Sequence, residues 1–355
     1  MISILKSDVQ LANVTTIKLG GTAKYFAQFN NVYELRQLLQ FAKKENLKIQ
    51  VIGGGSNIIF PDEGFKGLVL KNHIKELNYA INEHDVFLKA GGGNNWDELV
   101  SFCVNEGAQG IECLSGIPGS VGATPMQNVG AYGQEVADTI VHVQALRLED
   151  LAIVNFNRDE CGFGYRTSIF KQEQKDKYII TEVTFMLRLN KEPELKYKEL
   201  KDEVEKFYDY SNFSNRDKLK FVRDKVIEIR RRKSMVIDAN DSNSVSCGSF
   251  FMNPVLNGEE YKKFEETLFH FPIKPKVFQT DGKYKIPAAW LIENAGFHKG
   301  MNRNGAAISE NHSLALVNRG CTSAQLLELA NDIQNKVKQF FGINLVMEPV
   351  IVINN

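Results

Sequence analysis

The chain has 355 residues and 43 basic against 43 acidic side chains, so its formal net charge is zero. This length allows two or three domains with their own cores, and the balanced charge gives no general attraction to nucleic acid or membranes. No apolar run approaches the roughly 20 residues of a membrane span, and the N-terminus lacks the pattern of a secretion signal. We therefore expect a cytoplasmic protein with neither a membrane nor a nucleic-acid partner.

The five cysteines are odd in number and far apart, with no CxxC and no metal-ligand spacing. The sequence therefore predicts free thiols and no metal site.

The first part of the chain alternates strand and helix patterns. Residues 22–29 alternate as a strand, Asn31 can cap a helix with apolar spacing, and residues 47–52 form another strand. That strand leads into Gly53–Asn57, which matches neither a Walker loop nor a dinucleotide fingerprint. The small residues at this strand end could still form an anion nest.

Two further glycine-rich segments follow. A short strand at 86–90 leads into Gly91–Gly93, after which Asn95 and Glu98 cap a helix whose N-terminus can face an anion. Residues 110–135, here called the ribbon, hold six glycines, two prolines and few charges. Three such segments favour a long ligand, such as a dinucleotide with a central pyrophosphate; tight turns in a β-rich domain are the alternative.

The middle of the chain is strand-rich at 140–148, 152–156 and 178–189. Between the last two strands, Arg166 lies on a turn among Phe163, Tyr165 and Phe170, where it could bind a carboxylate bidentately.

A charged, tyrosine-rich segment begins at Asn190 and leads into a basic helix at 216–233, with nine basic and three acidic residues. The helix has one apolar face. It could be simply solvated, or Arg230 and Lys233 could hold a phosphorylated substrate. Nucleic acid is disfavoured because no aromatic stacking platform accompanies the charge. The apolar face consists of Leu219, Val222, Val226 and Ile229.

The C-terminal third carries two further candidate residues. Ser249 stands between a glycine and two phenylalanines, and Glu348 lies within an apolar strand predicted at 343–353, on the face of Val346 and Val350. A carboxylate buried there costs several kcal/mol unless it is paired or protonated, which favours a functional role over an edge position facing water.

Two helices are also predicted in this third. One covers 286–300 and breaks at Gly296. The other is capped by Thr322 and Gln325 and ends at Gly342, with a core stripe of Leu326, Leu329, Ala330, Ile333, Val337 and Phe340.

Seven segments occur in an order typical of one family. Together they closely resemble the UDP-N-acetylenolpyruvoylglucosamine reductases, and the tyrosine-containing insertion resembles the type I branch of that family. The segments are TTIKLGGTAKYF, VIGGGSNIIF, GIPGSVGATPMQNVGAYGQE, FGYRTSIFK, CGSFFMNP, AAWLIENAGFHKG and LVMEP.

The resemblance implies an α+β fold, with a two-subdomain FAD-binding part of the vanillyl-alcohol-oxidase type and a C-terminal α+β substrate-binding domain. The expected divisions are 1–72 for the first FAD-binding subdomain, 73–215 for the second, with the insertion near 190–215, and 216–355 for the substrate-binding domain. Its last strand would return Glu348 to the active site.

The resemblance also implies the reaction: NADPH-dependent reduction of the enolpyruvyl group of UDP-N-acetylglucosamine enolpyruvate to UDP-N-acetylmuramate, for peptidoglycan synthesis, by a monomer. Arg166 and Glu348 would stabilise the enolate and its carboxylate, and Ser249 would donate the completing proton. FAD would be bound by Gly53, Gly54, Gly55, Ser56, Asn57, Ser115, Gly116, Ile117, Pro118, Gly119, Ser120, Gly122, Ala123, Gln127, Asn128, Gly130, Ala131 and Tyr132. The UDP-sugar would be bound by Tyr132, Tyr197, Arg230, Lys233, Asn253 and Gln279.

Two alternatives share parts of this pattern. An FAD-dependent sugar or alcohol oxidase often tethers its flavin through His or Cys, but none of the three glycine segments contains a histidine. Non-covalent FAD is therefore expected. A non-catalytic nucleotide binder is disfavoured because Arg166, Ser249 and Glu348 occur together.

Overall fold

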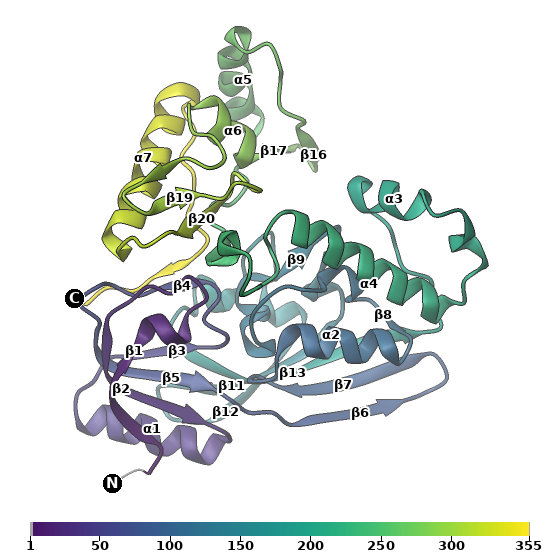
Figure 1. The fold of residues 1–355 in the computed structure, drawn as a ribbon. Helices are drawn as coiled ribbons and strands as arrows, with labels where there is room; N and C mark the ends of the chain where they lie inside the picture. The colour runs from purple at the N-terminus through teal and green to yellow at the C-terminus, as the bar shows by residue number, and fades with distance from the viewer. Residues whose placement is uncertain (1–2, 355) are drawn as a thin grey trace. The chain divides into compact units, whose positions relative to one another are not determined.

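A computed structural model describes residues 3–354, apart from the side chain of His270. The chain forms two compact units, each built from more than one segment. Unit 1 comprises Met1–Val9, Ala23–Gly55 and Phe65–Val236, and unit 2 comprises Gln10–Thr22, Ser56–Gly64 and Ile237–Asn355. Figure 1 labels their elements along the chain.

Unit 1 begins with a four-stranded sheet in the order β1-β2-β5-β3, in which β2, β5 and β3 run parallel. Helix α1 covers it, because Leu35, Leu38 and Leu39 point into a core shared with Phe29 and Leu70. Asn31 caps this helix by accepting the Glu34 N–H, as predicted. The elements are β1 Leu5–Gln10, β2 Thr22–Phe29, α1 Val32–Lys44, β3 Ile49–Ile52 and β5 Phe65–Asn72.

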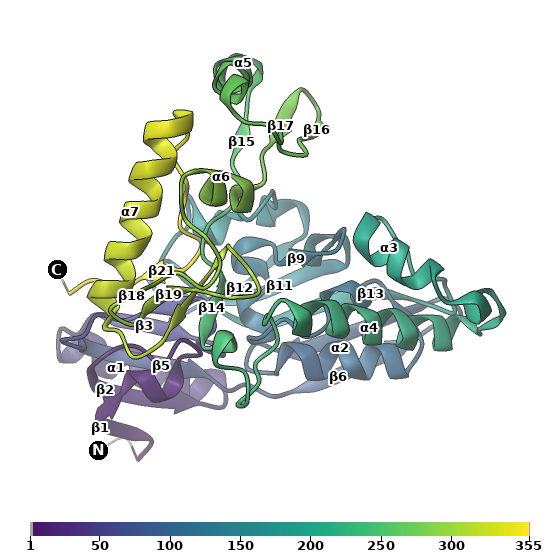
Figure 2. The same cartoon turned by 45° about the horizontal axis from the view of Figure 1, so that its top comes forward.

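A larger antiparallel sheet follows in the order β12-β11-β13-β7-β6, with β8 paired to the end of β13. Its core joins the apolar face of α2, including Trp96 and Val100, to Leu88 and Phe185 of the strands. In both ribbon views α2 and the later helix α4, Asn215–Arg232, lie side by side (Figures 1 and 2). The strands are β6 Leu77–Ile81, β7 Asp85–Gly91, β8 Ala108–Gln109, β11 Ile140–Arg147, β12 Ile153–Asn157 and β13 Tyr178–Leu189, and the helix α2 is Trp96–Asn105.

The ribbon connects β8 to β11 through short 3₁₀ turns and one small hairpin. Its left-handed residues include Asn128 and Tyr132, with φ of 45° and 49°, which are uncommon values for residues other than glycine. The elements are η2 Glu112–Leu114, η3 Val121–Ala123, η4 Pro125–Gln127, β9 Gly130–Ala131 and β10 Gln134–Glu135.

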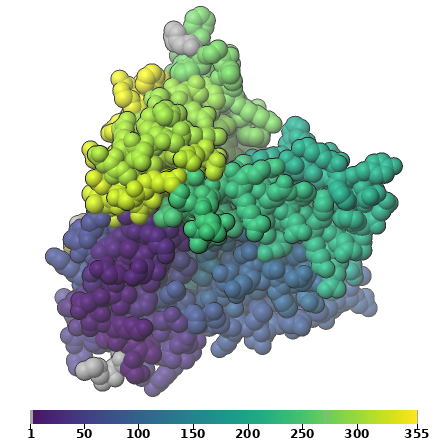
Figure 3. All heavy atoms as spheres, in the orientation of Figure 1, coloured from purple at the N-terminus to yellow at the C-terminus, as the bar shows by residue number. Residues whose placement is uncertain are grey.

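The charged segment after β13 forms helix α3, Lys198–Glu205, and helix α4, Asn215–Arg232. The predicted apolar face of α4 is confirmed: Leu219, Val222, Val226 and Ile229 are all fully buried. Figure 3 shows atoms of this teal-to-green segment at the surface of unit 1.

Unit 2 surrounds one core that includes Phe250, Phe264, Leu291 and Ile333. Unit 2 contains two small antiparallel sheets, in the orders β14-β20-β19-β18 and β15-β17-β16, and the parallel pair β21 and β4. The strands are β4 Ile58–Ile59, β14 Ser246–Ser249, β15 Val255–Leu256, β16 Phe278–Thr280, β17 Lys283–Lys285, β18 Asn302–Arg303, β19 Ala306–Ile308, β20 Ala315–Asn318 and β21 Val350–Ile351. The helices are α5 Gly258–Thr267, α6 Ala288–Asn294 and α7 Ser323–Phe341.

The predicted ends of α7 are confirmed. Thr322 and Gln325 form a reciprocal capping box, and Gly342 adopts the left-handed conformation after the last turn. The predicted core stripe is wrong at one position: Phe341 is buried, whereas Phe340 is 49% exposed.

Two predicted elements are shorter than expected. The helix predicted at 286–300 covers only Ala288–Asn294, because Pro287 precedes its first turn and Gly296 has a φ of 95°. The strand predicted at 343–353 is reduced to Val350–Ile351. Pro349 has no N–H, and the preceding residues make single hydrogen bonds to the segment around Phe250.

The domain prediction and the observed division follow different boundaries. Residues 216–236, predicted to begin the substrate-binding domain, lie in unit 1, while residues 10–22 and 56–64 lie in unit 2. The further division of residues 1–215 into two subdomains stays a prediction.

Candidate active site

The three glycine segments meet in unit 1. A Cβ atom on Gly53 would lie 2.1 Å from Ser120 Oγ, and one on Gly54 would lie 2.9 Å from Gly119 Cα. A Cβ atom on Gly122 would lie 3.0 Å from Gly92 Cα, and the Gly122 N–H donates to Gly92 O over 2.9 Å. At Gly54 and Gly122 the neighbouring atoms are backbone atoms at about 3 Å, so glycine lets these segments pack backbone against backbone, whereas Gly53 faces the Ser120 side chain.

This arrangement leaves backbone donors at the first glycine segment and the ribbon. Among residues 3–354, no protein hydrogen bond uses the N–H groups of Gly54, Ile117 or Gly119. Backbone N–H groups gathered in this way suit the oxygens of a phosphate or pyrophosphate. The geometry therefore fits a dinucleotide such as FAD. The first glycine segment crosses the boundary of unit 1, since Gly53–Gly55 belong to unit 1 and Ser56 and Asn57 to unit 2.

Several polar side chains of the ribbon are engaged within the protein. Ser115 is fully buried and donates to Glu112 O, and Thr124 donates to Val121 O. The buried Asn128 amide donates to Glu135 and to Gly164 O, and its oxygen accepts the Ala137 N–H. These side chains hold the conformation of the ribbon, leaving mainly backbone groups to meet a ligand.

Helices α2 and α4 fix the start of the ribbon. Asp97, in the first turn of α2, accepts the Gly116 N–H over 2.6 Å and a bidentate pair from Arg223 at 2.6 and 2.9 Å. Burial by itself would raise the pKa of the Asp97 carboxyl. The Arg223 and Gly116 donors outweigh burial and lower that pKa overall.

Arg166 is tied to the ribbon. Its φ is 53°, its Nη2 donates to Gly130 O over 2.7 Å, and its guanidinium lies 5.5 Å from the centre of the Tyr165 ring. Lys171 Nζ bonds both Arg166 O and Gln127 Oε1, at 3.3 and 3.2 Å. The predicted turn thus fixes a half-buried cation beside the ribbon.

Tyr132 and Tyr197, both predicted to contact the UDP-sugar, pack edge to face with ring centres 5.5 Å apart. Burial raises the pKa of Tyr132 to about 12, so its hydroxyl stays protonated at neutral pH. Arg230 lies near Gly116; its Nη2 donates to Met235 O, and its buried Nε has no hydrogen-bond partner among the described residues. Three predicted residues therefore gather at the ribbon.

Most other cations of α4 have nearby acidic partners. Lys233 pairs with Glu199 over 2.6 Å, Lys218 pairs with Glu192, and Arg232 pairs with Glu203 over 3.2 Å. The sequence prediction of a strongly basic patch overlooked these partners, which lie some 26 to 34 residues away in the chain. The helix is therefore largely neutralised, and Lys233 already holds a carboxylate.

In unit 2, Ser249 and Glu348 lie on neighbouring segments. Ser249 is the half-buried last residue of β14 and follows Gly248, whose φ is 72°. The Glu348 N–H donates to Phe250 O over 2.9 Å, and Met347 forms a β-bridge with Phe251. The backbone therefore brings two predicted catalytic residues together.

The environment predicted for Glu348 is wrong in one respect. Val346 and Val350, which were predicted to share its face, are 57% and 46% exposed. Glu348 itself is half-buried, so the expected apolar face does not form around it. Its backbone oxygen accepts Asn57 Nδ2 over 3.3 Å.

The two remaining predicted substrate residues are also in unit 2. Asn253 Oδ1 accepts the Ala288 N–H over 2.8 Å and so caps α6. Gln279 is exposed on β16 and approaches the Tyr284 hydroxyl at 3.3 Å.

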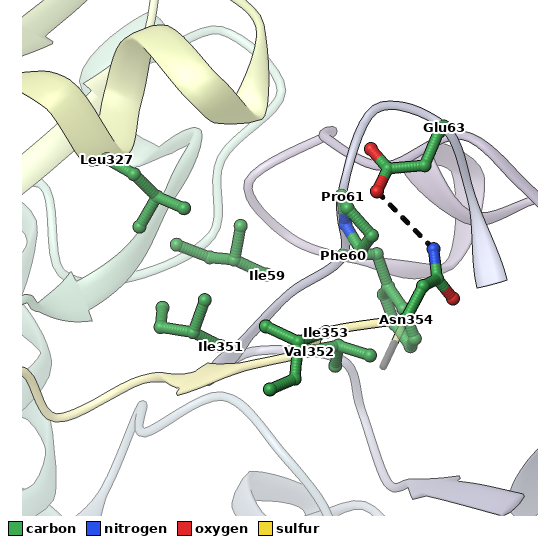
Figure 4. Close-up of a pocket in the computed structure, with 9 residues that line it drawn as sticks. All are labelled: Ile59, Phe60, Pro61, Glu63, Leu327, Ile351, Val352, Ile353 and Asn354. Carbon is green, nitrogen blue, oxygen red and sulfur yellow. Dashed lines mark hydrogen bonds between the residues drawn. The ribbon is translucent and has the colours of Figure 1, made fainter. Parts of the chain in front are cut away.

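A cavity of about 280 Å³ in unit 2 lies away from these side chains (Figure 4). Isoleucines from β4 and the C-terminal segment line it, with Glu63 and Asn354 at its edge, and it contains none of the predicted catalytic residues. Its lining is Ile59, Phe60, Pro61, Glu63, Leu327, Ile351, Val352, Ile353 and Asn354.

Sequence reasoning missed Glu112, a fully buried carboxyl at the start of the ribbon. It accepts the Gly110 N–H over 2.7 Å and Gln134 Nε2 over 2.8 Å. The signal was available, because Glu112 and Glu135 are the only charged residues in the ribbon. Burying a carboxylate is costly unless it is paired or protonated, and that cost, considered above for Glu348, applies equally to Glu112.

Residues 23–152 match the model of an FAD binding domain, and residues 240–352 match the C-terminal domain of UDP-N-acetylenolpyruvoylglucosamine reductase. A reductase of that name from Thermobifida fusca is 41% identical, with 97% of each chain covered. The chain belongs to the UDP-N-acetylenolpyruvoylglucosamine reductase family. This confirms the predicted family and its combination of FAD-binding and C-terminal domains.

Other members support the same assignment. The reductase of Aliivibrio fischeri is 39% identical, with 96% of this chain and 92% of that protein covered. The solved reductase of Thermus caldophilus superposes with a TM-score of 0.65 at 23% identity, covering 98% of this chain and 99% of that one. That structure shares the fold.

Two kinds of feature are absent from the described residues. No helix there is long and apolar enough to cross a membrane. Residues 3–354 also contain no group of three or more acidic, histidine or cysteine side chains suited to a metal ion. The five cysteines are free, as predicted, and all of them are buried.

Proposed function

We propose that this chain reduces the enolpyruvyl group of UDP-N-acetylglucosamine enolpyruvate, giving UDP-N-acetylmuramate for peptidoglycan synthesis. The observation that carries the proposal is the near-complete match to the reductase family together with the glycine-lined ribbon. A non-covalently bound FAD would supply the hydride chemistry that links NADPH to the methylene carbon of the enolpyruvyl group.

The proposed flavin site uses the backbone of Gly53–Asn57 and of the ribbon from Ser115 to Tyr132. The N–H groups of Gly54, Ile117 and Gly119 would meet phosphate oxygens. The close packing of Gly54 on Gly119 supports this role, because the two donor-bearing segments are adjacent.

Arg166 would bind the substrate carboxylate and stabilise the negative charge that develops on it. A guanidinium remains charged at all working pH values and presents a fork of donors to a carboxylate. The bond from its Nη2 to Gly130 O leaves its side chain oriented before substrate binds, which reduces the cost of reorganisation in the transition state.

Ser249 would donate the proton from its Oγ to the carbon next to the carboxylate. A hydroxyl is a weak acid, but an enolate carbon is a strong base, and exclusion of water favours transfer between them. Glu348 would act on the same carboxylate through a proton or a bridging water, and the neighbouring backbone of Ser249 and Glu348 supports this pairing.

The UDP-sugar would be bound by Tyr132, Tyr197, Arg230, Lys233, Asn253 and Gln279. The buried Nε of Arg230 supports its role. Lys233 would have to exchange Glu199 for the ligand, and Asn253 would contribute while capping α6. We further propose that the protein works as a monomer in the cytoplasm.

The variant Ser249→Ala tests the proposed proton donor. Reduction of the flavin by NADPH is expected to stay within twofold of the unsubstituted protein, whereas reoxidation by the enolpyruvyl sugar is expected to fall by about 10²- to 10⁴-fold, a typical contribution of general acid catalysis. Stopped-flow absorbance separates the two half-reactions. Reoxidation at an unchanged rate would remove Ser249 from the mechanism. Ser246→Ala, at the other end of β14, removes a hydroxyl that accepts the Gly248 N–H, and so reports any loss that comes from distortion of β14 and not from the missing Ser249 hydroxyl.

A further inference from the structure

Glu112 and Gln134 join the two ends of the ribbon through a buried hydrogen bond. Glu112 Oε1 accepts Gln134 Nε2 over 2.8 Å, although 22 residues separate them. Glu112 is fully buried and Gln134 is 5% exposed. The stretch that they enclose contains the ribbon part of the proposed flavin site.

Two backbone N–H groups complete this arrangement. The Gly110 N–H donates to Glu112 Oε2 over 2.7 Å, and the Cys113 N–H donates to Gln134 Oε1 over 2.8 Å. Because the Gln134 oxygen is occupied by Cys113, its amide nitrogen faces Glu112. The orientation of both side chains is therefore determined by the backbone on either side.

Both side chains are buried, Glu112 fully and Gln134 nearly so. Water is excluded at this depth, so a donor that loses its acceptor here stays unsatisfied. Burial raises the pKa of the Glu112 carboxyl, and the Gly110 and Gln134 donors oppose that shift by favouring the ionised form. The Glu112–Gln134 bond and the bond from the Cys113 N–H to Gln134 Oε1 join residues near the two ends of the ribbon directly to each other.

We propose that Glu112 and Gln134 are positioning residues that hold the ribbon closed around the flavin site. They act through the backbone from Ser115 to Tyr132 and need not touch the ligand themselves. Opening the pair would separate the ribbon ends and displace the N–H groups of Ile117 and Gly119. This inference rests on the flavin site proposed above.

The chain allows a reciprocal exchange of the two side chains. In Glu112→Gln, an amide NH₂ faces either the Gly110 N–H or the Gln134 NH₂, and one donor loses its acceptor. In Gln134→Glu, two buried carboxyl groups face each other. In the double variant, the new amide at position 112 would accept from Gly110 and donate to the new carboxylate at position 134. That carboxylate would still accept from Cys113, so each hydrogen bond is restored.

The experiment measures FAD dissociation constants of the purified protein and its three variants by flavin fluorescence. It also records the visible circular dichroism of the bound flavin at saturation. The control Glu149→Gln makes the same chemical change on an exposed turn of unit 1. We expect each single variant to bind FAD at least tenfold more weakly, with altered flavin dichroism. The double variant should return to within about threefold of the unsubstituted protein.

Three results would overturn the proposal. In the first, the single variants bind FAD normally, and in the second, the double variant binds it as weakly as the single variants. In the third result, single variants saturated with FAD show unchanged flavin dichroism and differ only in lower thermal stability. If a single variant does not fold, the double variant still decides the question, because restored folding and binding support the pair and continued failure contradicts it. If the unsubstituted protein itself does not bind FAD, the proposed function fails instead.

Discussion

Gly54 offers the sharpest test of how the flavin site is built. A Cβ atom at this position would lie 2.9 Å from Gly119 Cα and 3.2 Å from its carbonyl carbon. Ordinary carbon contacts lie at about 3.5–4.0 Å, so Gly54→Ala requires the two segments to separate by roughly 0.6–1 Å. The obstructing atoms belong to the backbone and have no alternative rotamer.

Overpacking of this kind costs typically about 1–3 kcal/mol. If the closed arrangement of the two segments is the one that binds FAD, this strain weakens binding by roughly 5- to 150-fold, at about 1.4 kcal/mol per factor of ten. The assay is titration of the FAD-free protein with FAD, followed by flavin fluorescence.

Gly258→Ala is the matched control, since no atom lies within 4 Å of a Cβ there and the residue begins α5 in unit 2. We expect it to bind FAD normally. A Gly54→Ala protein that binds FAD within twofold of the unsubstituted protein would refute the assignment of this contact to the flavin site. Equal losses in both variants would show that the effect is not specific to the ribbon.

Three further predictions concern stability. Thr322→Ala removes the cap of α7 and should lower the free energy of unfolding, measured by urea denaturation, by about 0.5–2 kcal/mol. The control Ser323→Ala keeps this cap and removes only the hydrogen bond from the Ser323 hydroxyl to Phe60 O. Phe341→Ala should cost about 3–5 kcal/mol and Phe340→Ala less than about 1 kcal/mol, and the reverse order would contradict the observed burial. Because the pKa of Asp97 is lowered by folding, its pair with Arg223 stabilises the protein above the unfolded pKa of about 3.9 and is lost as pH falls through the lower folded value. Asp97→Asn should therefore flatten the fall of Tm with acidification below about pH 4, and an unchanged pH dependence would exclude Asp97 as a contributor.

Local signals in the sequence predicted the caps and most strands well. Asn31 and Thr322 cap their helices as expected, because a side-chain oxygen at the N-cap and the first-turn N–H groups are only two or three residues apart. The strand predicted at 178–189 forms as Tyr178–Leu189. Such features depend on neighbouring residues that the sequence displays directly.

Features that depend on distant residues were harder to predict. The charge of α4 is balanced by partners such as Asp97 and Glu203, which no helical pattern reveals. The final strand was predicted from apolar alternation, but Pro349 interrupts its hydrogen bonding and Val346 faces solvent. The register of α7 was misjudged by one residue at its end, where Phe340 and Phe341 are adjacent and only packing selects between them.

The candidate site also combines features that neighbouring residues determine with features that depend on distant residues. Glycine content marked the three segments as places where a ligand can approach the backbone, but it did not predict that the segments pack on one another, as the contact of Gly54 with Gly119 shows. The side chains that hold the ribbon in place, Glu112 and Gln134, were not recognised as a pair because 22 residues separate them.

The reaction itself is tested most directly by the visible spectrum of the purified protein without oxygen. NADPH should bleach the flavin absorbance, and subsequent UDP-N-acetylglucosamine enolpyruvate should restore it. A flavin that NADPH reduces but that only oxygen restores would contradict the reductase and indicate an oxidase, and a protein that binds no flavin would contradict the flavin site itself.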